Sequence, residues 1–546
     1  MISFAALVLA AVLFKVLGNQ IFTPLSVVVA GSLFVLRYQL QARRREQVES
    51  FLLQFGVLLY ALANQDPSYY EHAALLLCLV PTVERWRRIR QTAVAEGSIL
   101  LVFLFIVWSV CWTSNVDMSL AGFVMSALCL MFLIGYVLAF DGDMNVILGR
   151  ILTVLVAVMV GSWIVGAMGH GAAGKTFSGV TLHRNQLGFL LGLLILISLF
   201  VLRFRFRWPH VLNCLAAAGL LIYIDSKSAI ISIAFTALVL FVLSARKWKV
   251  YLGLLALGIV VFITALPSPK MDNFALWMGR DPTFTSRTEI WADSVKLAAE
   301  QPFTGYGYNA VWSAHENRLA QYRNAPGPLY AHAHNAWIDW VLQLGLGGLA
   351  IYIVFLGVLL KRALAHARES ERVSSHDSSG DSDGRPLAIQ AVCLLIYIQI
   401  YDLANVSTVP VTRFGFFMLA VASLSLWLGA TAARAKQPET SRPAGQGRSA
   451  SSFPASTPAW PKGHRILTGV VLVLVGFVAM SAYAVWEDGR RFSAAEKRPS
   501  PAPNSVAAAS LLDPGQFQWK TQEKLRDYAR RHRLALQEMM RRSESP

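Results

Sequence analysis

A series of long apolar blocks recurs along this chain of 546 residues and constrains its fold more than any other feature. The blocks that read as helices lie at about 3–17, 21–37, 49–64, 70–83, 97–113, 118–140, 145–168, 186–202, 209–224, 228–244, 249–266, 335–360, 386–404, 411–431 and 465–485. Crossing a bilayer takes roughly 20 apolar residues, so the shorter blocks are expected to cross it only in part. Only 15% of the residues are charged, too few for a soluble protein. We therefore predict an all-α polytopic membrane protein with roughly 12–15 transmembrane helices.

The distribution of basic residues predicts the orientation of these helices. Clusters such as RYQLQARRR, RFRFR and ARKWK follow even-numbered blocks, whereas the loops after several odd-numbered blocks are short and almost free of arginine. Loops that stay in the cytoplasm accumulate Lys and Arg, so we predict a cytoplasmic N-terminus. The first block lacks a basic n-region and a cleavage site, and we expect it to be retained. The net charge of +17 then reflects orientation, and no nucleic acid is expected as a partner.

Loop composition divides the chain into segments. Residues 1–145 hold N-terminal transmembrane helices, and residues 146–431 form the predicted core, which includes one large outer loop of short helices at 267–334. The other segments are a flexible cytoplasmic loop at 369–385, a flexible cytoplasmic linker at 432–464, a final transmembrane helix at 465–485 and a C-terminal tail at 486–546. We place the tail outside and expect it to serve self-association or partner docking.

Four polar motifs fall on the predicted outer face, each at or near a helix end. They are HRNQ at 183–186, DSKS at 225–228, SRTEIW at 286–291 and HAHN at 332–335. A cavity lined by Arg, Lys and His suits an anionic substrate presented by membrane lipids, because Arg grips phosphate oxygens bidentately and Lys acts as a point charge. Histidine suits proton transfer near neutral pH.

The cationic residues also have plainer interpretations. Arg184 and Lys227 can be interfacial anchors whose charged heads reach toward water. Asp225 beside Lys227 predicts either a local salt bridge or a cap of the turn. Arg287 can simply pair with an acidic neighbour on its own helix.

The histidines can likewise be ordinary polar residues at a membrane boundary. His332 keeps that interpretation, whereas His334, followed by Asn335 and an amphipathic span, is the stronger candidate for chemistry. No third ligand has a telling spacing, so we expect no metal and no cofactor. The isolated cysteines are expected to be buried apolar residues: Cys78, Cys111, Cys129, Cys214 and Cys393. Three further histidines are left without a role: His170, His183 and His315.

Taken in order, these motifs resemble the O-antigen ligase and polysaccharide polymerase superfamily of bacterial inner-membrane glycosyltransferases. The similarity lies in FSGVTLHRNQLGFLLGL, DSKSAIIS, GRDPTFTSRTEIWADSVKLAAEQPFTGYGYNAVW and HAHNAWIDWVLQLGLGGL, and it spans roughly residues 150–430. The sequence departs from the family pattern at Lys227, where many ligases have Arg, and at Ser286, where Gly is frequent. These departures lean toward the exopolysaccharide-polymerase branch and leave the acceptor open.

The resemblance implies a metal-independent, inverting glycosyltransferase with a periplasmic active site and residues 146–431 as its catalytic core. Its donor would be a glycan linked to undecaprenyl pyrophosphate. Arg184, Lys227 and Arg287 would hold the pyrophosphate, and His334 would orient or deprotonate the acceptor hydroxyl. The second-tier site residues are Asn335, Asp339, His332 and Asn185.

Two alternatives remain beside a ligase that uses lipid A–core as acceptor. A repeat-unit polymerase would use the same donor chemistry and a growing glycan as acceptor. A transporter of lipid-linked glycans would bind the same headgroup. A transporter is expected to carry ionisable residues near the bilayer midplane and an internal repeat, whereas the charges here gather at one face.

Overall fold

The structure, a computed structural model, describes residues 2–17, 22, 25–33, 40–62, 97–169, 172–173, 176–204, 206–244, 287–312, 332–376, 384–409 and 413–436. Within these ranges the helices are joined by turns and loops, and one hairpin is present, in which β1 (Ala172–Ala173) pairs antiparallel with β2 (Thr176–Phe177). The predicted all-α polytopic membrane class is confirmed. The predicted blocks at 70–83, 249–266 and 465–485, most of the loop 267–334 and the tail lie outside the described residues.

Five helices of the described part are long and apolar enough to cross a membrane. They are α7 (Val116–Ala139), α8 (Met144–Ala167), α9 (Arg184–Phe204), α16 (Ala336–His376) and α18 (Phe414–Lys436). Shorter apolar helices accompany them: α1 (Ile2–Leu17), α6 (Gly97–Trp108), α10 (Trp208–Tyr223), α11 (Lys227–Ser244) and α17 (Gly384–Asp402). The remaining helices are α3 (Ala42–Leu62), the 3₁₀ turn η1 (Ser109–Cys111) and α14 (Arg287–Glu300).

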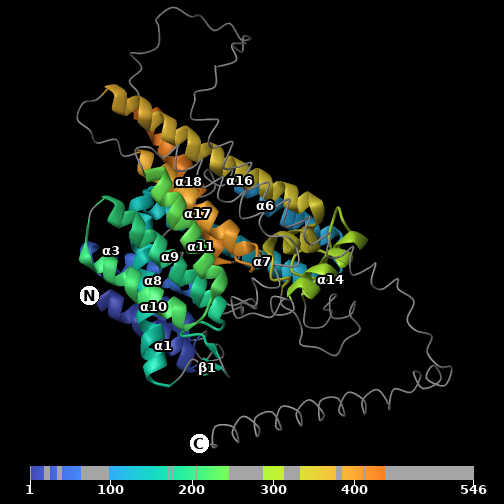
Figure 1. Cartoon of the computed structure of the whole chain (residues 1–546), viewed down its shortest axis with the longest axis horizontal. Coiled ribbons are helices and arrows are strands. Elements are labelled where there is room, and N and C mark those ends of the chain that lie inside the picture. Colours follow the sequence, from blue (N-terminus) through green and yellow to red (C-terminus); the bar gives the residue numbers. More distant parts are fainter. Residues whose placement is uncertain are drawn as a thin grey trace, which may run out of the picture. The chain divides into compact units, whose positions relative to one another are not determined.

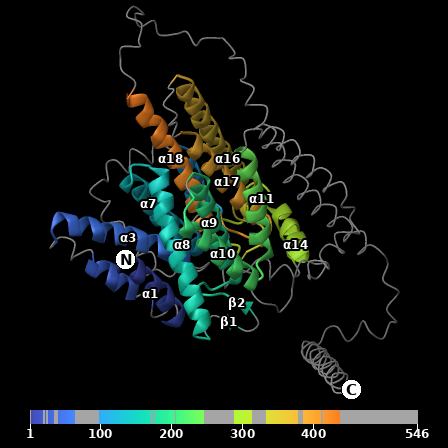
Figure 2. The same ribbon diagram turned by 60° about the vertical axis from the view of Figure 1, so that its left-hand side comes forward.

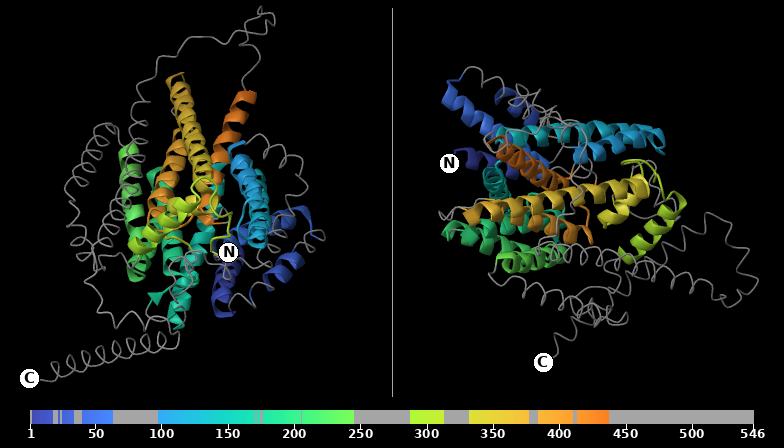
Figure 3. Two further views of the ribbon diagram at one scale, coloured as in Figure 1. Left: turned by 90° about the vertical axis from the view of Figure 1, so that its right-hand side faces the viewer. Right: turned by 90° about the horizontal axis from the view of Figure 1, so that it is seen from above.

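The helices pack in neighbouring groups. Helices α16, α17 and α18 lie against one another, α9 packs on both α10 and α11, and α8 packs on α1 and α3 (Figures 1 and 2). Small residues permit close approach: Gly192 of α9 faces the Tyr397 ring of α17, whose hydroxyl donates to the Phe189 carbonyl at 2.8 Å. Helix α14 packs against α16 near its start (Figure 3).

Two helices reach further into the predicted connections than the apolar pattern indicates. Helix α3 begins at Ala42, inside a predicted basic cluster, where Arg45 and Glu49 form an ion pair of 3.1 Å one helical turn apart. Helix α16 continues to His376, although we placed a flexible connection at 369–385. Charged, polar sequences of this kind can extend a helix beyond the apolar span that anchors it.

Helix α16 is broken at Gly345, whose φ of 66° and ψ of −172° are not helical. An uninterrupted helix would pair the Leu346 and Gly347 amides with the Leu342 and Gln343 carbonyls. The segment 302–307, which we call the stapling segment, supplies new partners for all four groups. The bonds are Tyr306 N–H to Leu342 O at 2.9 Å, Gly307 N–H to Gln343 O at 2.9 Å, Leu346 N–H to Pro302 O at 2.7 Å and Gly347 N–H to Phe303 O at 3.3 Å.

These four hydrogen bonds, which we call the staple, require glycine at two positions. Gly305 and Gly345 both have φ near +65°, in the left-handed region that favours glycine. A Cβ atom on Gly305 would lie 2.6 Å from the Gly345 nitrogen, and one on Gly345 would overlap the Phe303 carbonyl. The PFTGYGY and LGLGGL elements of the sequence therefore meet backbone to backbone.

Candidate functional site

Helix α16 begins with a cap made by Asn335. Its side-chain oxygen accepts from the Trp337 amide at 2.9 Å and from the Ile338 amide at 3.2 Å, so two free N–H groups of the first turn are satisfied. Its amide nitrogen donates to the Leu403 carbonyl at 3.1 Å. Asn335 therefore fixes where α16 starts and ties that start to the loop after α17.

The two histidines before this cap differ in what they do. His334 has a φ of 54°, a left-handed conformation that is uncommon for a residue other than glycine. Its backbone N–H donates to Nδ1 of His332 at 3.0 Å, and the two ring centroids lie 4.1 Å apart. The Nδ1 atom of His334 is buried without a hydrogen-bond partner among the described residues. His332 thus supports the backbone, and His334 has a ring nitrogen to offer.

Asp339 is buried one turn inside α16, with 1% of its surface exposed. Its Oδ1 atom accepts from Trp312 Nε1 at 2.9 Å and from the Ala333 amide at 3.3 Å. The Ala333 carbonyl in turn accepts from Trp291 Nε1 at 3.0 Å. The residue between the two histidines is therefore held from both sides, which makes Asp339 a positioning residue.

The loop 403–409, which follows α17 and which we call the hub loop, organises two guanidinium groups. Arg287, the first residue of α14, donates from Nη1 to the Ala404 carbonyl. Arg413, just before α18, donates from Nη1 to the Val406 carbonyl at 2.6 Å. The Nε atom of Arg413 is buried without a partner in the described part of the chain.

The other two motifs reach the same place. Asn405 of the hub loop donates to Ser228 Oγ at 2.6 Å, which ties the loop to the start of α11. Tyr401, just before the loop, donates from its hydroxyl to the Asn185 carbonyl at 2.7 Å, at the start of α9. All four polar motifs found in the sequence are thus brought to the end of the bundle where α9, α11, α16 and α18 begin. We call it the cluster end.

The hub loop is itself held by Asp402, the last residue of α17. One carboxylate oxygen accepts from the Ser407 amide at 2.6 Å and the other from the Thr408 hydroxyl at 2.5 Å. Asp402 is 1% exposed. This buried carboxylate gives the loop a fixed shape, and that shape aims the loop carbonyls at the two guanidinium groups.

The electrostatics of the cluster end keep both histidines neutral. Burial, followed by the positive charges of Arg287 and Arg413 and the effect of His183, lowers the pKa of His334 to about 4. Burial, then His334, then Arg413, Arg287 and His183 hold the pKa of His332 well below its ordinary value. At neutral pH the cluster end therefore presents two fixed cations next to an uncharged imidazole.

The predicted cations fall into two groups. Arg287 lies on the same side as His334, because Arg287 donates to the Ala404 carbonyl while Asn335, next to His334, donates to the adjacent Leu403 carbonyl. Lys227 forms an ion pair of 2.9 Å with Asp225, so the predicted local salt bridge is present. Arg184 is the first residue of α9. The hydrogen bond between Tyr401 and this first turn is made to the backbone carbonyl of Asn185 and not to the Asn185 side chain.

Sequence reasoning did not single out Arg413 or the hub loop, and it assigned no role to His183. A signal for Arg413 was available, because an arginine at the outer end of the block at 411–431 is rare on a face otherwise poor in arginine. The hub loop, LANVSTV, carries no charge and no glycine. It acts mainly through backbone groups, which leave no side-chain pattern in a sequence.

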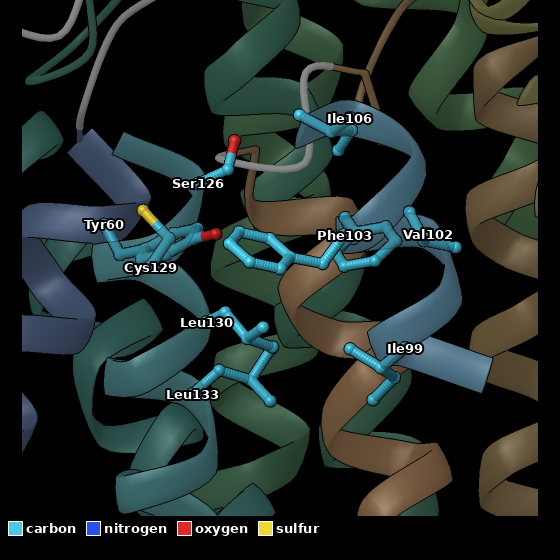
Figure 4. Close-up of a pocket in the computed structure, with 10 residues that line it drawn as sticks. Tyr60, Ile99, Val102, Phe103, Ile106, Ser126, Cys129, Leu130 and Leu133 are labelled. Atoms are coloured by element: carbon cyan, nitrogen blue, oxygen red, sulfur yellow. The ribbon is translucent and has the colours of Figure 1, made fainter. Parts of the chain in front are cut away.

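Two further features of the described residues bear on ligands. No group of three or more His, Cys, Asp or Glu side chains in the described part is placed to hold a metal ion. A pocket between α3, α6, α7 and α18 is apolar, and Figure 4 shows Tyr60 and Cys129 on one side of it and Ile99, Val102 and Ile106 on the other. The pocket lining contains no charged side chain, so it does not suit an anionic headgroup: Tyr60, Ile99, Val102, Phe103, Ile106, Ser126, Cys129, Leu130, Leu133 and Phe416.

These features define an all-α membrane protein with a cationic, histidine-containing cluster where helix ends meet. Residues 212–353 match the family model described as O-antigen ligase, which supports a place for this part of the chain in the O-antigen ligase and polysaccharide polymerase superfamily. The matched range includes Arg287 and His334 but ends before the hub loop and Arg413.

A curated relative is the exopolysaccharide production protein ExoQ of Rhizobium meliloti (strain 1021). It is 27% identical over 218 residues, and the alignment covers 36% of this chain and 49% of the relative. The chain thus spans about half the length of that relative.

Proposed function

We propose that the protein transfers a glycan from undecaprenyl pyrophosphate to an acceptor hydroxyl at the periplasmic face of the inner membrane. The observation that carries the proposal is that Arg287, Arg413 and Asn335, the neighbour of His334, all donate to carbonyls of the same hub loop at the cluster end. An uncharged imidazole beside two guanidinium groups suits a reaction in which a hydroxyl attacks and a phosphate group leaves.

Arg287 and Arg413 would hold the pyrophosphate. Each donates one N–H to a loop carbonyl, which fixes the guanidinium plane, and a planar guanidinium group suits bidentate contact with phosphate oxygens. Lys227, already paired with Asp225, would act as a peripheral cation, and Arg184 would lie at the start of α9. Two positive charges at the leaving group can do the work that a divalent metal does in other transferases.

The transfer needs one bond to form and one to break. The acceptor oxygen attacks the anomeric carbon, the bond from that carbon to the pyrophosphate oxygen breaks, and its electron pair stays on the phosphate. The acceptor proton passes to His334 and then to solvent. Attack opposite the leaving group inverts the anomeric configuration.

Donor binding would also change the pKa of His334, the proposed base. A pKa of about 4 leaves His334 neutral but makes it a weak base. Part of that lowering comes from the two guanidinium groups, and a bound pyrophosphate would neutralise them. The pKa of His334 would then rise toward its ordinary range only when the donor is in place, which limits proton transfer to the loaded enzyme.

Two acceptors fit this donor chemistry. Lipid A–core as acceptor would make the protein an O-antigen ligase. A growing glycan as acceptor would make it a repeat-unit polymerase, a candidate favoured by the similarity to an exopolysaccharide production protein. A transporter of lipid-linked glycans would bind the same headgroup but release no undecaprenyl pyrophosphate.

The test is a reconstituted reaction with purified protein and an undecaprenyl-pyrophosphate-linked glycan. We expect undecaprenyl pyrophosphate to be released with either lipid A–core or an oligosaccharide as acceptor, and the active acceptor separates ligase from polymerase. Loss of release in His334→Ala and Arg287→Ala is expected, as is full activity in the presence of EDTA. Movement of intact donor across the membrane without release would support the transporter instead.

A further inference from the structure

We infer that His332 is a positioning residue: its Nδ1 atom, as an uncharged hydrogen-bond acceptor, holds His334 in its left-handed backbone conformation. This inference rests on the proposed role of His334 in glycan transfer. It gives the first histidine of the HAHN motif a role distinct from that of the second.

The argument starts from the hydrogen bond between the two residues. The His334 backbone N–H can only donate, so Nδ1 of His332 must accept at the 3.0 Å separation. A neutral imidazole with an accepting Nδ1 carries its proton on Nε2. A charged imidazolium would have a proton on both nitrogens and could not accept. The contact therefore specifies one tautomer and one charge state of His332.

The conformation that this bond supports is costly. A residue with a side chain at φ near +55° is strained, and surrounding contacts must hold it there. Asp339 fixes the Ala333 amide on one side and Asn335 caps α16 on the other. The bond to His332 Nδ1 fixes the amide of His334 itself. Without it, the His334 ring would be free to leave its place beside the guanidinium groups.

The surroundings of His332 keep it in the accepting form. The groups whose charges reach it are His334, Arg413, Arg287 and His183, and all of them are neutral or positive at neutral pH. Cations nearby disfavour protonation of His332. The cations that would bind the donor thus also keep Nδ1 of His332 unprotonated. The geometry of His334 depends on this atom as a hydrogen-bond acceptor.

Side-chain shape provides the test. The amide oxygen of asparagine occupies the place of Nδ1, whereas glutamine reaches the place of Nε2 and has no polar atom at Nδ1. We expect His332→Asn to keep kcat within about threefold of the wild type. We expect His332→Gln and His332→Ala to lose about tenfold in kcat, which corresponds to about 1.4 kcal/mol, with little change in KM for the donor.

Other orders of activity would overturn the inference. If His332→Gln were more active than His332→Asn, Nε2 would be the important atom and His332 would contact substrate. If kcat of His332→Asn were no higher than that of His332→Ala, or if all three variants had the kcat of the wild type, the hydrogen bond to Nδ1 would have no role in positioning His334. Thermal unfolding of each variant in detergent shows which of them fold.

A second measurement needs no activity. Nitrogen-15 NMR of histidine-labelled protein in membranes, with His332→Asn to assign the signal, should show an unprotonated Nδ1 and a protonated Nε2 at His332. This pattern is expected even if the wild type transfers no glycan, so failure of the proposed function remains distinguishable. A signal from the opposite tautomer or from the doubly protonated ring would refute the inference.

Discussion

Arg287 and Arg413 donate to carbonyls two residues apart in one loop, those of Ala404 and Val406. The two arginines come from different helices and lie more than 100 positions apart in the sequence, as their numbers show. The hub loop therefore sets the spacing between two positive charges. The placement of these two cations depends on a backbone that carries no charge of its own.

The first prediction concerns these guanidinium groups. Arg413→Gln and Arg287→Gln should each lower kcat/KM for the lipid-linked donor by about 10- to 100-fold, the range expected for a charge-assisted contact. Arg362 is the matched control, because it is an arginine that joins α16 to α18 through a 2.8 Å bond to Ser423, away from the cluster end. A loss in Arg362→Gln as large as that in Arg413→Gln would point to general destabilisation.

The second prediction concerns pH. Protonation removes the base, so activity falls as pH falls through the pKa of His334. In the free enzyme that pKa is about 4, so the acidic limb of kcat/KM should lie near pH 4. The limb of kcat, which reports the donor complex, should lie at higher pH because the bound pyrophosphate offsets the guanidinium charges. Arg413→Gln should move the kcat/KM limb upward, and coincident limbs near pH 6.5 in both enzymes would contradict this electrostatic account.

The third prediction concerns the peripheral cation. The Lys227–Asp225 pair is half-exposed, so neither Lys227→Met nor Asp225→Asn should impair folding. Lys227→Met should lower kcat/KM for the donor by less than about tenfold, because a solvated point charge contributes less than a fixed guanidinium. Titration of the donor against the variant in detergent measures this. A loss equal to that of Arg287→Gln would place Lys227 in direct contact with the pyrophosphate.

The fourth prediction concerns the staple of α16. Gly345→Ala and Gly305→Ala should each lower the free energy of unfolding by at least about 2 kcal/mol, because both need a left-handed backbone and a close approach. Gly357→Ala on the same helix is the control, since an added Cβ there meets nothing within 4 Å. It should be neutral or stabilising by up to about 1 kcal/mol. Equal stability of Gly345→Ala and Gly357→Ala in denaturant titrations would argue against the staple.

The fifth prediction concerns orientation. Cys111 is exposed in the turn after α6, and in a variant in which it is the only cysteine it should react with a membrane-impermeant maleimide in intact cells. A single cysteine at position 207, in the exposed turn before α10, should react only after lysis. The reverse pattern would place the cluster end in the cytoplasm and remove the periplasmic assignment.

Much of the fold could be predicted because apolar length is a property of local sequence. The block expected at 118–140 is α7 at Val116–Ala139, and the block expected at 145–168 is α8 at Met144–Ala167. The gathering of the four motifs could also be predicted, since alternating spans place every second helix end on one face. The break at Gly345 could not, because the apolar run continues through it and the partners that stabilise it come from a distant segment.

Part of the candidate site could be predicted because Arg287, His334 and Asn335 stand in motifs with a recognisable chemical composition. Arg413 was overlooked because it stands alone, and its importance follows from the hub loop rather than from its neighbours in sequence. The sequence alone does not tell whether Lys227 is available to a ligand or is paired with an acidic neighbour. The 2.9 Å contact with Asp225 shows that it forms an ion pair.

The staple has a consequence for how the protein is made. A ribosome synthesises residues 302–307 before it synthesises α16, so the partners of the broken turn are translated first. Until they dock, four backbone groups around Gly345 lack hydrogen bonds, a state that is costly in lipid. The first part of α16 therefore cannot complete its insertion as an independent unit. Its assembly depends on a segment that the ribosome has already made, so the stapling segment acts on α16 as an assembly factor within the same chain.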